Sequence, residues 1–374
     1  MKILFISHYC GFLGSNRSLA SIIMYFRDKG IDVEVLLPTR RDFYQYLKNE
    51  GIKTYSFFFI FESLYVKKNK KYLSLPILWI YDLLAFPFLL LKIWMINPDI
   101  IYTNSTTDLF SVFIAKILRK KHIMHVREFM QEDFGGYCVL GKSIKRKIIL
   151  LSDKLIFVSK AVARAVVGDI PPYGKVIYNG LPIPSGEVKP KSFDGNLRIG
   201  VVGNIDISKQ QHLAISFMPE ILKKYPGISL HLIGDKECPY KQKLIHMVNS
   251  MNLNDKVIFE GFIKSPEEIY KRIDVLLMCS RSEAFGRVTI EAMLRKIPVI
   301  GYAAGGTTEL IDEGVTGFKF KDYGDVIMAL DTIVNNKEIV NSIINNAYIN
   351  AKEKYSESAY TTNVYNFIND VNWK

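Results

Sequence analysis

Short apolar runs alternate with helical patterns along almost the whole chain. Those of the first half lie at residues 2–7, 33–38, 99–104, 122–126, 154–159 and 175–180. Each run is apolar at nearly every position rather than at every second one. This pattern is typical of strands in a parallel sheet whose two faces are both covered by helices.

The pattern pauses at residues 182–195, which are rich in Pro, Gly, Ser and Lys, and then starts again. The apolar runs of the second half lie at residues 197–203, 228–234, 256–261, 275–280 and 298–302. A length of 374 residues is too great for one typical core and suits two. The chain therefore has an α/β fold class, with two doubly wound domains joined near residues 182–195.

Residues 73–96 form a long and very apolar segment. A transmembrane helix is one interpretation, although Asp82, Lys92, Pro76 and Pro87 lie inside the segment. A segment inserted between two strands of a parallel sheet also cannot cross a membrane alone. We favour burial in the N-terminal domain, with one face at a membrane surface.

The positive charge is confined to the first half of the chain. Residues 1–187 carry 26 Lys and Arg against 15 Asp and Glu, whereas residues 188–374 carry 23 against 22. The first half is therefore expected to attract an anionic partner: nucleic acid, a lipid surface or a phosphorylated substrate. The clusters KKNKK (67–71) and KSIKRK (142–147) fit either an anionic membrane surface or a solvated charged face. No nucleic-acid-binding module is visible.

Cysteine usage and the first residues favour a cytoplasmic location. The four cysteines are far apart, and their spacing suggests neither a disulfide framework nor a zinc site. The apolar run at residues 3–6 is too short for a secretory signal, so it is interpreted as a first buried strand.

The strongest chemical signal is the segment SRSEAFGRVTIEAM at residues 280–293, directly after an apolar run. Glu283 and Glu291 are eight residues apart, and a helix is predicted to begin after Gly286. The backbone N–H groups at a helix N-terminus suit a diphosphate, and a carboxylate about two turns further on suits ribose hydroxyls. Two such glutamates alone would equally fit solvent-exposed charges.

The complete pattern resembles the EX7E motif of family 4, the retaining glycosyltransferases of GT-B fold also called glycosyl transferases group 1. Further segments are similar to that family in order and spacing: 176–183, 201–210, 232–237, 257–263, 303–311 and 314–318. The resemblance implies two Rossmann-like doubly wound domains facing across a cleft. The N-terminal domain (1–185) would bind the acceptor and the C-terminal domain (186–355) the nucleotide sugar. A last helix in residues 356–374 would pack back on the first domain.

The resemblance also implies the donor site. Lys209 would bind the donor diphosphate, Glu283 the donor sugar and Glu291 the ribose. Asn204 stands where the family often has Arg, so one phosphate-binding cation is missing, and Arg281 or Arg287 would compensate. The remaining expected donor contacts are Phe262 and Ile263 at the nucleobase, with Phe285, Gly286 and Arg287 at the phosphate or sugar.

In the first half, the loop at residues 11–19 follows a predicted strand and opens a helix, as the family's first loop does. Gly14, and after it Gly11, are its candidate contacts. The resemblance implies that His125 contacts the donor sugar. Asn104, Arg127 and Glu128 also follow predicted strands, where ligands bind in such sheets, and are expected to contact the acceptor.

The sequence contains no Asp-x-Asp, so the metal-binding signature of the other common glycosyltransferase fold is absent. We therefore expect a metal-independent transferase without a cofactor, in which Lys209 and helix dipoles meet the charge of the leaving group. It would move a hexosyl group from a UDP- or GDP-sugar to a glycan or lipid-linked acceptor at the inner face of the cell membrane, in cell-surface polysaccharide biosynthesis. The alternatives are a sugar-nucleotide epimerase of the same fold and a non-catalytic glycan- or lipid-binding protein.

Overall fold

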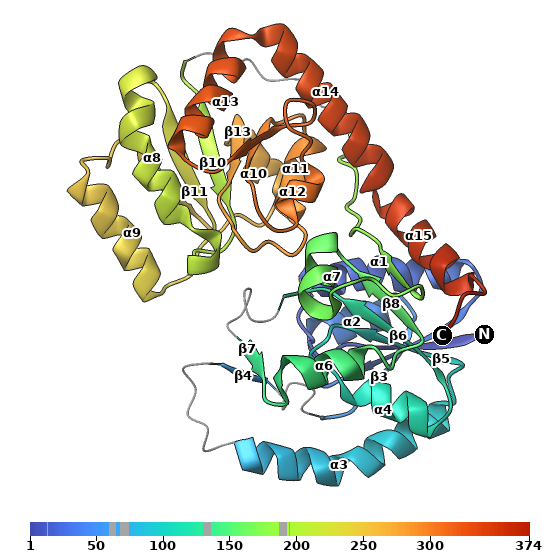
Figure 1. Cartoon of the computed structure of the whole chain (residues 1–374). Helices are drawn as coiled ribbons and strands as arrows, with labels where there is room; N and C mark the ends of the chain where they lie inside the picture. Colours follow the sequence, from blue (N-terminus) through green and yellow to red (C-terminus); the bar gives the residue numbers. More distant parts are fainter. Residues whose placement is uncertain (13, 60–64, 68–74, 130–135, 187–192, 194) are drawn as a thin grey trace. The chain divides into compact units, whose positions relative to one another are not determined.

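A computed structural model describes the chain apart from residues 13, 60–64, 68–74, 130–135, 187–192 and 194 (Figure 1). The chain divides into two compact units. Unit 1 contains Met1–Gly180 together with Glu357–Lys374, and unit 2 contains Leu181–Ser356. Each unit is built around its own parallel sheet.

Unit 1 contains a seven-stranded sheet in the order β3-β2-β1-β5-β6-β8-β9. All neighbouring strands in this sheet are parallel. Their bounds are Lys53–Ser56, Asp32–Leu37, Lys2–Ile6, Ile100–Asn104, Lys121–Val126, Lys154–Phe157 and Gly174–Val176. A separate antiparallel pair joins β4 (Tyr65–Lys67) to β7 (Gly136–Cys138).

Alternate residues of β1 belong to two different cores. Ile3 and Phe5 pack in a cluster with α1 (Gly14–Asp28), α2 (Asp42–Asn49) and α15 (Glu357–Asn369). Leu4 and Ile6 pack in a cluster with α3 (Leu75–Ile96) and α4 (Phe110–Ile117). A strand buried on both faces needs apolar residues at every position, and this explains the continuous apolar run. Unit 1 also contains α6 (Gly141–Ile149) and α7 (Lys160–Val167).

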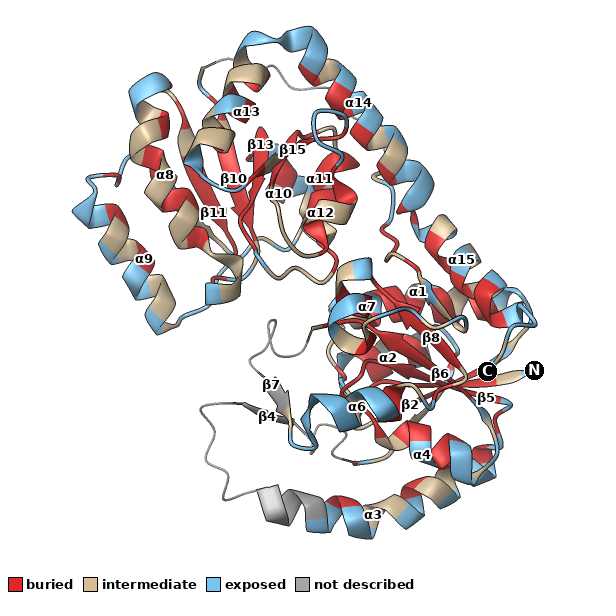
Figure 2. Cartoon of the chain, viewed as in Figure 1, coloured by how far each residue is buried: buried red, intermediate tan, exposed pale blue. Residues whose placement is uncertain are grey.

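Unit 2 contains a six-stranded parallel sheet in the order β12-β11-β10-β13-β14-β15. These strands span Val257–Gly261, Ser229–Ile233, Arg198–Val202, Val275–Met278, Val299–Tyr302 and Phe318–Phe320. One face packs against α8 (Gln211–Lys224), α9 (Pro239–Ser250) and α13 (Tyr323–Asn335). The remaining helices are η2 (Ile207–Lys209), α10 (Pro266–Lys271), α11 (Arg287–Met293), α12 (Thr307–Leu310) and α14 (Lys337–Lys354). Figure 2 shows that the strands of both sheets are largely buried.

Both sheets confirm the predicted doubly wound fold. In unit 1, β1, β2 and β3 follow one another in one direction across the sheet, and the later strands, from β5 onward, lie on the other side of β1. In unit 2, β10, β11 and β12 follow one direction, and the later strands, from β13 onward, lie on the other side of β10. Ligands bind doubly wound sheets at the carboxyl ends of the strands on either side of this reversal. We therefore expect ligands to bind near the loops that follow β1, β5, β10 and β13.

Some predicted features lie outside the described residues. These include most of the KKNKK cluster, the first two residues of the apolar segment 73–96 and half of the 182–195 connection. Among the described helices, none combines the length and apolar character needed to cross a membrane.

Candidate active site

The structure brings Lys209 and Glu283 together at the strand-order reversal of unit 2. Lys209 ends the short helix η2 after β10, and Glu283 lies in the loop after β13. The Lys209 ammonium donates to Glu283 Oε2 at 2.7 Å. The two side chains are 29% and 17% exposed, so the pair is accessible from solvent while remaining partly desolvated. An ammonium held in this way is positioned for an anionic group arriving at the same edge of the sheet.

Two glycines shape the backbone around Glu283. Gly286 has a φ of 96° and precedes α11, so the helix begins in a turn that disfavours any residue with a side chain. The backbone N–H of Gly306 donates to the carbonyl of Glu283 at 2.7 Å. A Cβ atom at Gly306 would lie 2.7 Å from the carbonyl oxygen of Ala284. The loop after β14 can therefore lie against the Glu283 loop only because residue 306 has no side chain.

Helix α11 begins directly after Gly286, as predicted, so Glu283 lies in the loop before the helix. Glu291 lies inside α11, and its Oε2 accepts a hydrogen bond of 3.0 Å from the buried hydroxyl of Tyr270. Tyr270 thus orients Glu291, and no sequence pattern had indicated this residue.

The other expected donor contacts differ in their exposure. Asn204 and Phe262 are exposed, Phe262 by 71%, whereas Phe285 is buried. Ile263 and Arg287 are half-buried. Arg281 lies over the ring of Tyr302, with its guanidinium carbon 5.0 Å from the ring centre. Lys236, a cation that the sequence did not single out, pairs with Asp206 at 2.7 Å, and Asp206 in turn caps η2.

In unit 1, Asn16 organises the loop after β1. Its buried side chain amide donates to the carbonyls of Tyr9 and Gly11 at 2.8 and 2.9 Å. The same side chain accepts from the Ser7 hydroxyl at 2.8 Å. Gly14 is the first residue of α1 and has a φ of 33°. The loop is therefore held by Asn16, a residue that the glycine pattern did not single out.

Arg127 is buried in a network within unit 1. Its guanidinium donates to the side chain oxygens of Asn104, of Asn179 at 2.8 Å and of Tyr360 at 3.0 Å. Glu128 is equally enclosed, because its Oε1 accepts from Ser105, from the Thr106 backbone and from the Thr106 hydroxyl. These contacts give both residues a clear role in holding the carboxyl edge of the sheet. Acceptor contact by Arg127, Glu128 or Asn104 stays a prediction.

His125 ends β6 and is fully buried. Its Nδ1 lies 2.5 Å from the hydroxyl of Tyr102. Burial, and then the nearby charge of Arg127, hold the pKa of His125 well below its usual value. The imidazole is therefore neutral near pH 7. Within the described residues, the buried Nε2 atom of His125 has no hydrogen-bond partner, so this atom could still accept or donate one hydrogen bond.

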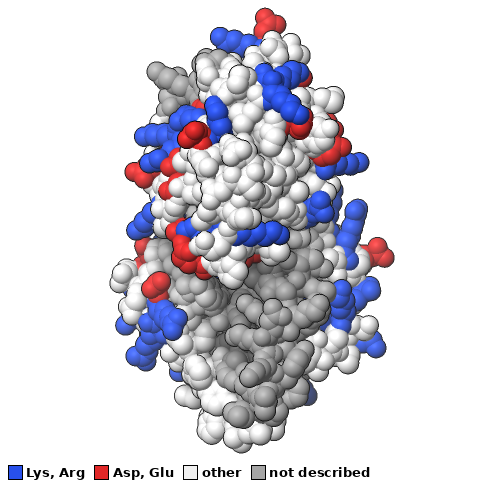
Figure 3. Space-filling view, turned by 90° about the vertical axis from the view of Figure 1, so that its left-hand side faces the viewer, with Lys and Arg blue, Asp and Glu red and all other residues white. Residues whose placement is uncertain are grey.

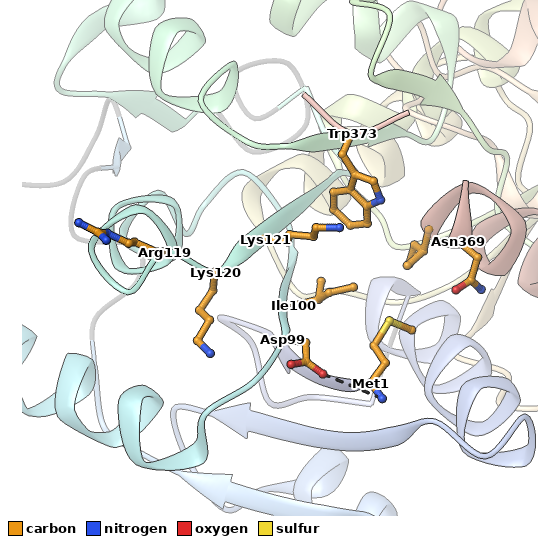
Figure 4. Close-up of a pocket in the computed structure, with 9 residues that line it drawn as sticks. Met1, Asp99, Ile100, Arg119, Lys120, Lys121, Asn369 and Trp373 are labelled. Atoms are coloured by element: carbon orange, nitrogen blue, oxygen red, sulfur yellow. Dashed lines mark ion pairs between the residues drawn. The ribbon is translucent and has the colours of Figure 1, made fainter. Parts of the chain in front are cut away.

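A pocket of about 500 Å³ lies at the opposite edge of the unit 1 sheet (Figure 4). Its lining residues come from the amino ends of strands, from the turn after α4 and from the end of the chain: Met1, Asp99, Ile100, Arg119, Lys120, Lys121, Ile368, Asn369 and Trp373. Because ligands of such sheets bind at the carboxyl ends, we do not assign chemistry to this pocket. Among the described residues, no group of His, Cys, Asp and Glu has the arrangement of a metal site.

Two family models together match most of the chain. The model described as Glycosyltransferase Family 4 matches residues 13–183, and that described as Glycosyl transferases group 1 matches residues 187–350. The chain belongs to the group 1 glycosyltransferases. The junction between the two matches falls within the connection predicted from composition.

Solved structures share the fold. The Anabaena protein HepE in complex with UDP superposes with a TM-score of 0.78 at 22% identity, covering 98% of this chain and 99% of that one. The lipopolysaccharide outer core galactosyltransferase WaaB superposes with a TM-score of 0.76 at 19% identity, covering 98% and 99%. At these identities the similarity establishes the GT-B fold alone.

Curated relatives match over parts of their length. The sulfoquinovosyl transferase of Arabidopsis thaliana is 27% identical over 75% of this chain. The poly(ribitol-phosphate) alpha-N-acetylglucosaminyltransferase of Staphylococcus aureus is 25% identical over 48%. The aligned region spans 58% and 37% of these two relatives, respectively.

Proposed function

We propose that this glycosyltransferase is a retaining, metal-independent hexosyltransferase that uses a UDP- or GDP-linked sugar. The observation that carries the proposal is the Lys209–Glu283 pair at the strand-order reversal, beside the start of α11. Lys209 would leave its carboxylate partner for the diphosphate of the donor and stabilise the negative charge that develops as the sugar departs. Glu283 would then be released to contact the donor sugar.

In this proposal unit 2 binds the donor and unit 1 binds the acceptor. Glu291, oriented by Tyr270, would accept hydrogen bonds from the ribose hydroxyls. Phe262 and Ile263 would contact the base, and Gly14 would approach the donor with the loop after β1. The crystallised Anabaena protein binds UDP and, in another structure, UDP-glucose, which supports a uridine nucleotide as the first donor to test.

The acceptor in this proposal is a glycan or a lipid-linked sugar in cell-surface polysaccharide biosynthesis. The capsular polysaccharide glycosyltransferase of Staphylococcus aureus, 26% identical over 46% of this chain, supports this class. The excess of Lys and Arg in the first half supports an anionic membrane surface as the place of reaction, which we take to be the cytoplasmic face.

Thermal-shift screening with UDP-, GDP- and dTDP-sugars tests donor binding directly. A donor at about 100 times its Kd should stabilise the protein by about 2.7 kcal/mol, since only the folded state binds it. Transfer assays with the donor found this way, followed by NMR of the anomeric proton of the product, test the retaining assignment. A product of inverted configuration would refute it. Conversion of the sugar nucleotide without an acceptor would favour an epimerase, and binding without turnover would favour a binding protein.

A further inference from the structure

Helix α3 is apolar on two opposite faces. Leu89, Ile93 and Ile96 are buried in the core beneath the unit 1 sheet. The α3 outer face consists of side chains that are 36 to 75% exposed: Ile80, Tyr81, Leu83, Leu84, Phe88, Leu91, Trp94 and Met95. At a rise of 1.5 Å per residue, this face extends for about 22 Å. A surface helix of a soluble protein normally presents charged residues on the side away from its core.

The two charged residues in α3 do not reach the α3 outer face. Asp82 is 2% exposed. The ammonium of Lys92 lies 4.5 Å from the centre of the Tyr55 ring, and Tyr55 packs against the inner core. At about 100° per residue, the outer residues cover an arc of about 160°, and both charged residues fall outside that arc. The outer face therefore offers apolar contact without a charge to direct a polar partner.

Helix α4, which contacts α3, adds two exposed apolar side chains and is followed by positive charge. Phe113 and Ile117 of α4 are 38% and 56% exposed, and the two helices meet through Phe86 and Phe110. Lys120 follows α4 and donates to the side chain of Asn97, just beyond α3, at 2.7 Å. Because an amide is neutral, Lys120 keeps its positive charge at the end of the α3 outer face.

Arg119 adds to this basic edge. It is exposed, and in Figure 4 Arg119 and Lys120 point away from Trp373, whereas Lys121 points toward it. In Figure 3 blue Lys and Arg side chains lie along both margins of unit 1, and the described atoms at its lower edge are white. Unit 1 carries 27 Lys and Arg against 16 Asp and Glu, a net charge of +11.

We propose that the α3 outer face lies in the headgroup region of an anionic lipid bilayer, with Arg119 and Lys120 at the phosphates. Leu, Phe, Trp and Met beside a basic edge are the composition of helices that bind in the plane of a membrane interface. A second copy of the chain fits less well, because its unit 1 carries the same net positive charge and offers no anionic surface to Arg119 and Lys120. The proposal rests on the membrane location given above and assigns it to one surface.

Co-sedimentation with vesicles tests this surface without any sugar nucleotide. The triple variant Leu84→Gln, Phe88→Gln and Leu91→Gln removes the centre of the α3 outer face and retains good helix formers. We expect its partition into phosphatidylcholine vesicles with about one third phosphatidylglycerol to fall at least about ten-fold. The matched control replaces equally exposed residues of unit 2: Met328→Gln, Ile339→Gln and Ile349→Gln. It should bind vesicles as the wild type does.

Fluorescence of Trp94, which is 61% exposed, gives a second readout. In a chain carrying Trp79→Phe and Trp373→Phe, Trp94 is the only tryptophan. Lipids brominated on the upper acyl chain should quench its emission when vesicles are added. Absence of quenching, or equal vesicle binding by the α3 triple variant, would overturn the proposal.

Sedimentation velocity distinguishes a lipid surface from a second copy of the chain as the partner of the α3 outer face. If the wild type is a dimer that the α3 triple variant converts to a monomer, with vesicle binding unchanged, the face joins two copies and the lipid proposal is wrong. Failure here is distinct from failure of the proposed function, because the triple variant should still shift its melting temperature with a sugar nucleotide. Loss of that shift in wild type and variant alike would count against the donor assignment alone.

Discussion

At the scale of single residues, the Lys209–Glu283 pair is the arrangement with the clearest chemical consequence. We expect Lys209→Ala to lower turnover by at least about 100-fold, the size of effect found when a preorganised charge on a leaving group is removed. Lys224→Ala is a matched control, because Lys224 forms a similar ion pair of 2.6 Å with Asp331 elsewhere in unit 2. Steady-state kinetics with both variants would check this, and near-normal turnover for Lys209→Ala would remove Lys209 from the mechanism.

Gly306 offers a steric test of the same site. In Gly306→Ala the new methyl group would meet the carbonyl oxygens of Ala284 and Glu283 at 2.7 and 2.9 Å, so the Glu283 loop has to move. We expect weaker donor binding together with a destabilisation of about 1–3 kcal/mol, because adding atoms to a closely packed site typically costs this much. Gly195→Ala is the control, since a Cβ there meets nothing within 4 Å. Donor titration and thermal unfolding measure both effects, and unchanged donor affinity would contradict this account of the loop.

The sequence pointed to Lys209 and Glu283 because each belongs to a local pattern after an apolar run. Their pairing across 74 residues followed from the shared sheet edge, not from any local signal. The partners of Arg127 were not predictable, because Asn179 and Tyr360 lie 52 and 233 positions further along the chain. Tyr270 was missed for the same reason, because the residues around it in the sequence do not indicate that its hydroxyl donates to Glu291.

At the scale of elements, α15 depends on Arg127. The Tyr360 hydroxyl accepts from the Arg127 guanidinium at 3.0 Å, and both side chains are buried. Tyr360→Phe should destabilise unit 1 by about 1–3 kcal/mol, because a buried cation loses one acceptor. Tyr365→Phe removes a hydroxyl from the same helix while its ring still packs on Tyr25 and Phe26, and should cost less. Urea unfolding of both variants checks this, and equal stability would indicate that Arg127 finds another acceptor.

Strand β6 contains a buried histidine that makes unit 1 sensitive to acid. Burial is the main cause that lowers the pKa of His122 from 6.5 to about 3, and its ring nitrogens meet Thr103 and Ser152 at 2.9 and 3.0 Å. Below about pH 6.5 the unfolded chain therefore binds a proton that the folded chain does not. The free energy of unfolding should fall as the pH drops from about 6.5 toward 3, by up to about 1.4 kcal/mol for each step of one in pH.

A variant isolates this contribution. His122→Asn should flatten the decrease of melting temperature between about pH 7 and pH 5, since the proton uptake of the unfolded chain is removed. His246→Asn, at an exposed position on α9, should leave the profile as in the wild type. Calorimetry at several pH values makes the comparison. Parallel profiles for His122→Asn and wild type would show that other groups govern acid unfolding.

Long apolar runs made most strands predictable, whereas the edge strands β3 and β15 were missed. Strand β3 reads KTYS and forms one edge of its sheet, so its residues are only half-buried or exposed and show no apolar run. Strand β15 has three residues at the edge of the other sheet. The segment of α3 was ambiguous for a different reason. A helix that is apolar on both faces has no periodicity from which to decide what covers it.

At the scale of the whole molecule, the proposed reaction needs no metal ion. The sequence lacks Asp-x-Asp, and Lys209 is the residue that we propose to bind the donor diphosphate. Excess EDTA should therefore leave the rate of transfer within about two-fold of its untreated value, because no bound cation is required to stabilise the leaving group. Initial rates with and without chelator test this. Loss of activity on chelation, restored by Mg²⁺ or Mn²⁺, would refute the metal-independent mechanism.

The return of α15 to unit 1 matters while the protein is being made. Domains generally fold as units, in order, as the chain leaves the ribosome. Unit 2 is continuous from Leu181 to Ser356, whereas unit 1 lacks α15 until residues 357–369 have emerged. During synthesis of unit 2, the nascent unit 1 thus exposes the apolar surface beneath α15 and leaves one donor of Arg127 without Tyr360. The first unit to be translated is the last to be completed, and over that interval it is the part of the chain with the greatest need of a chaperone.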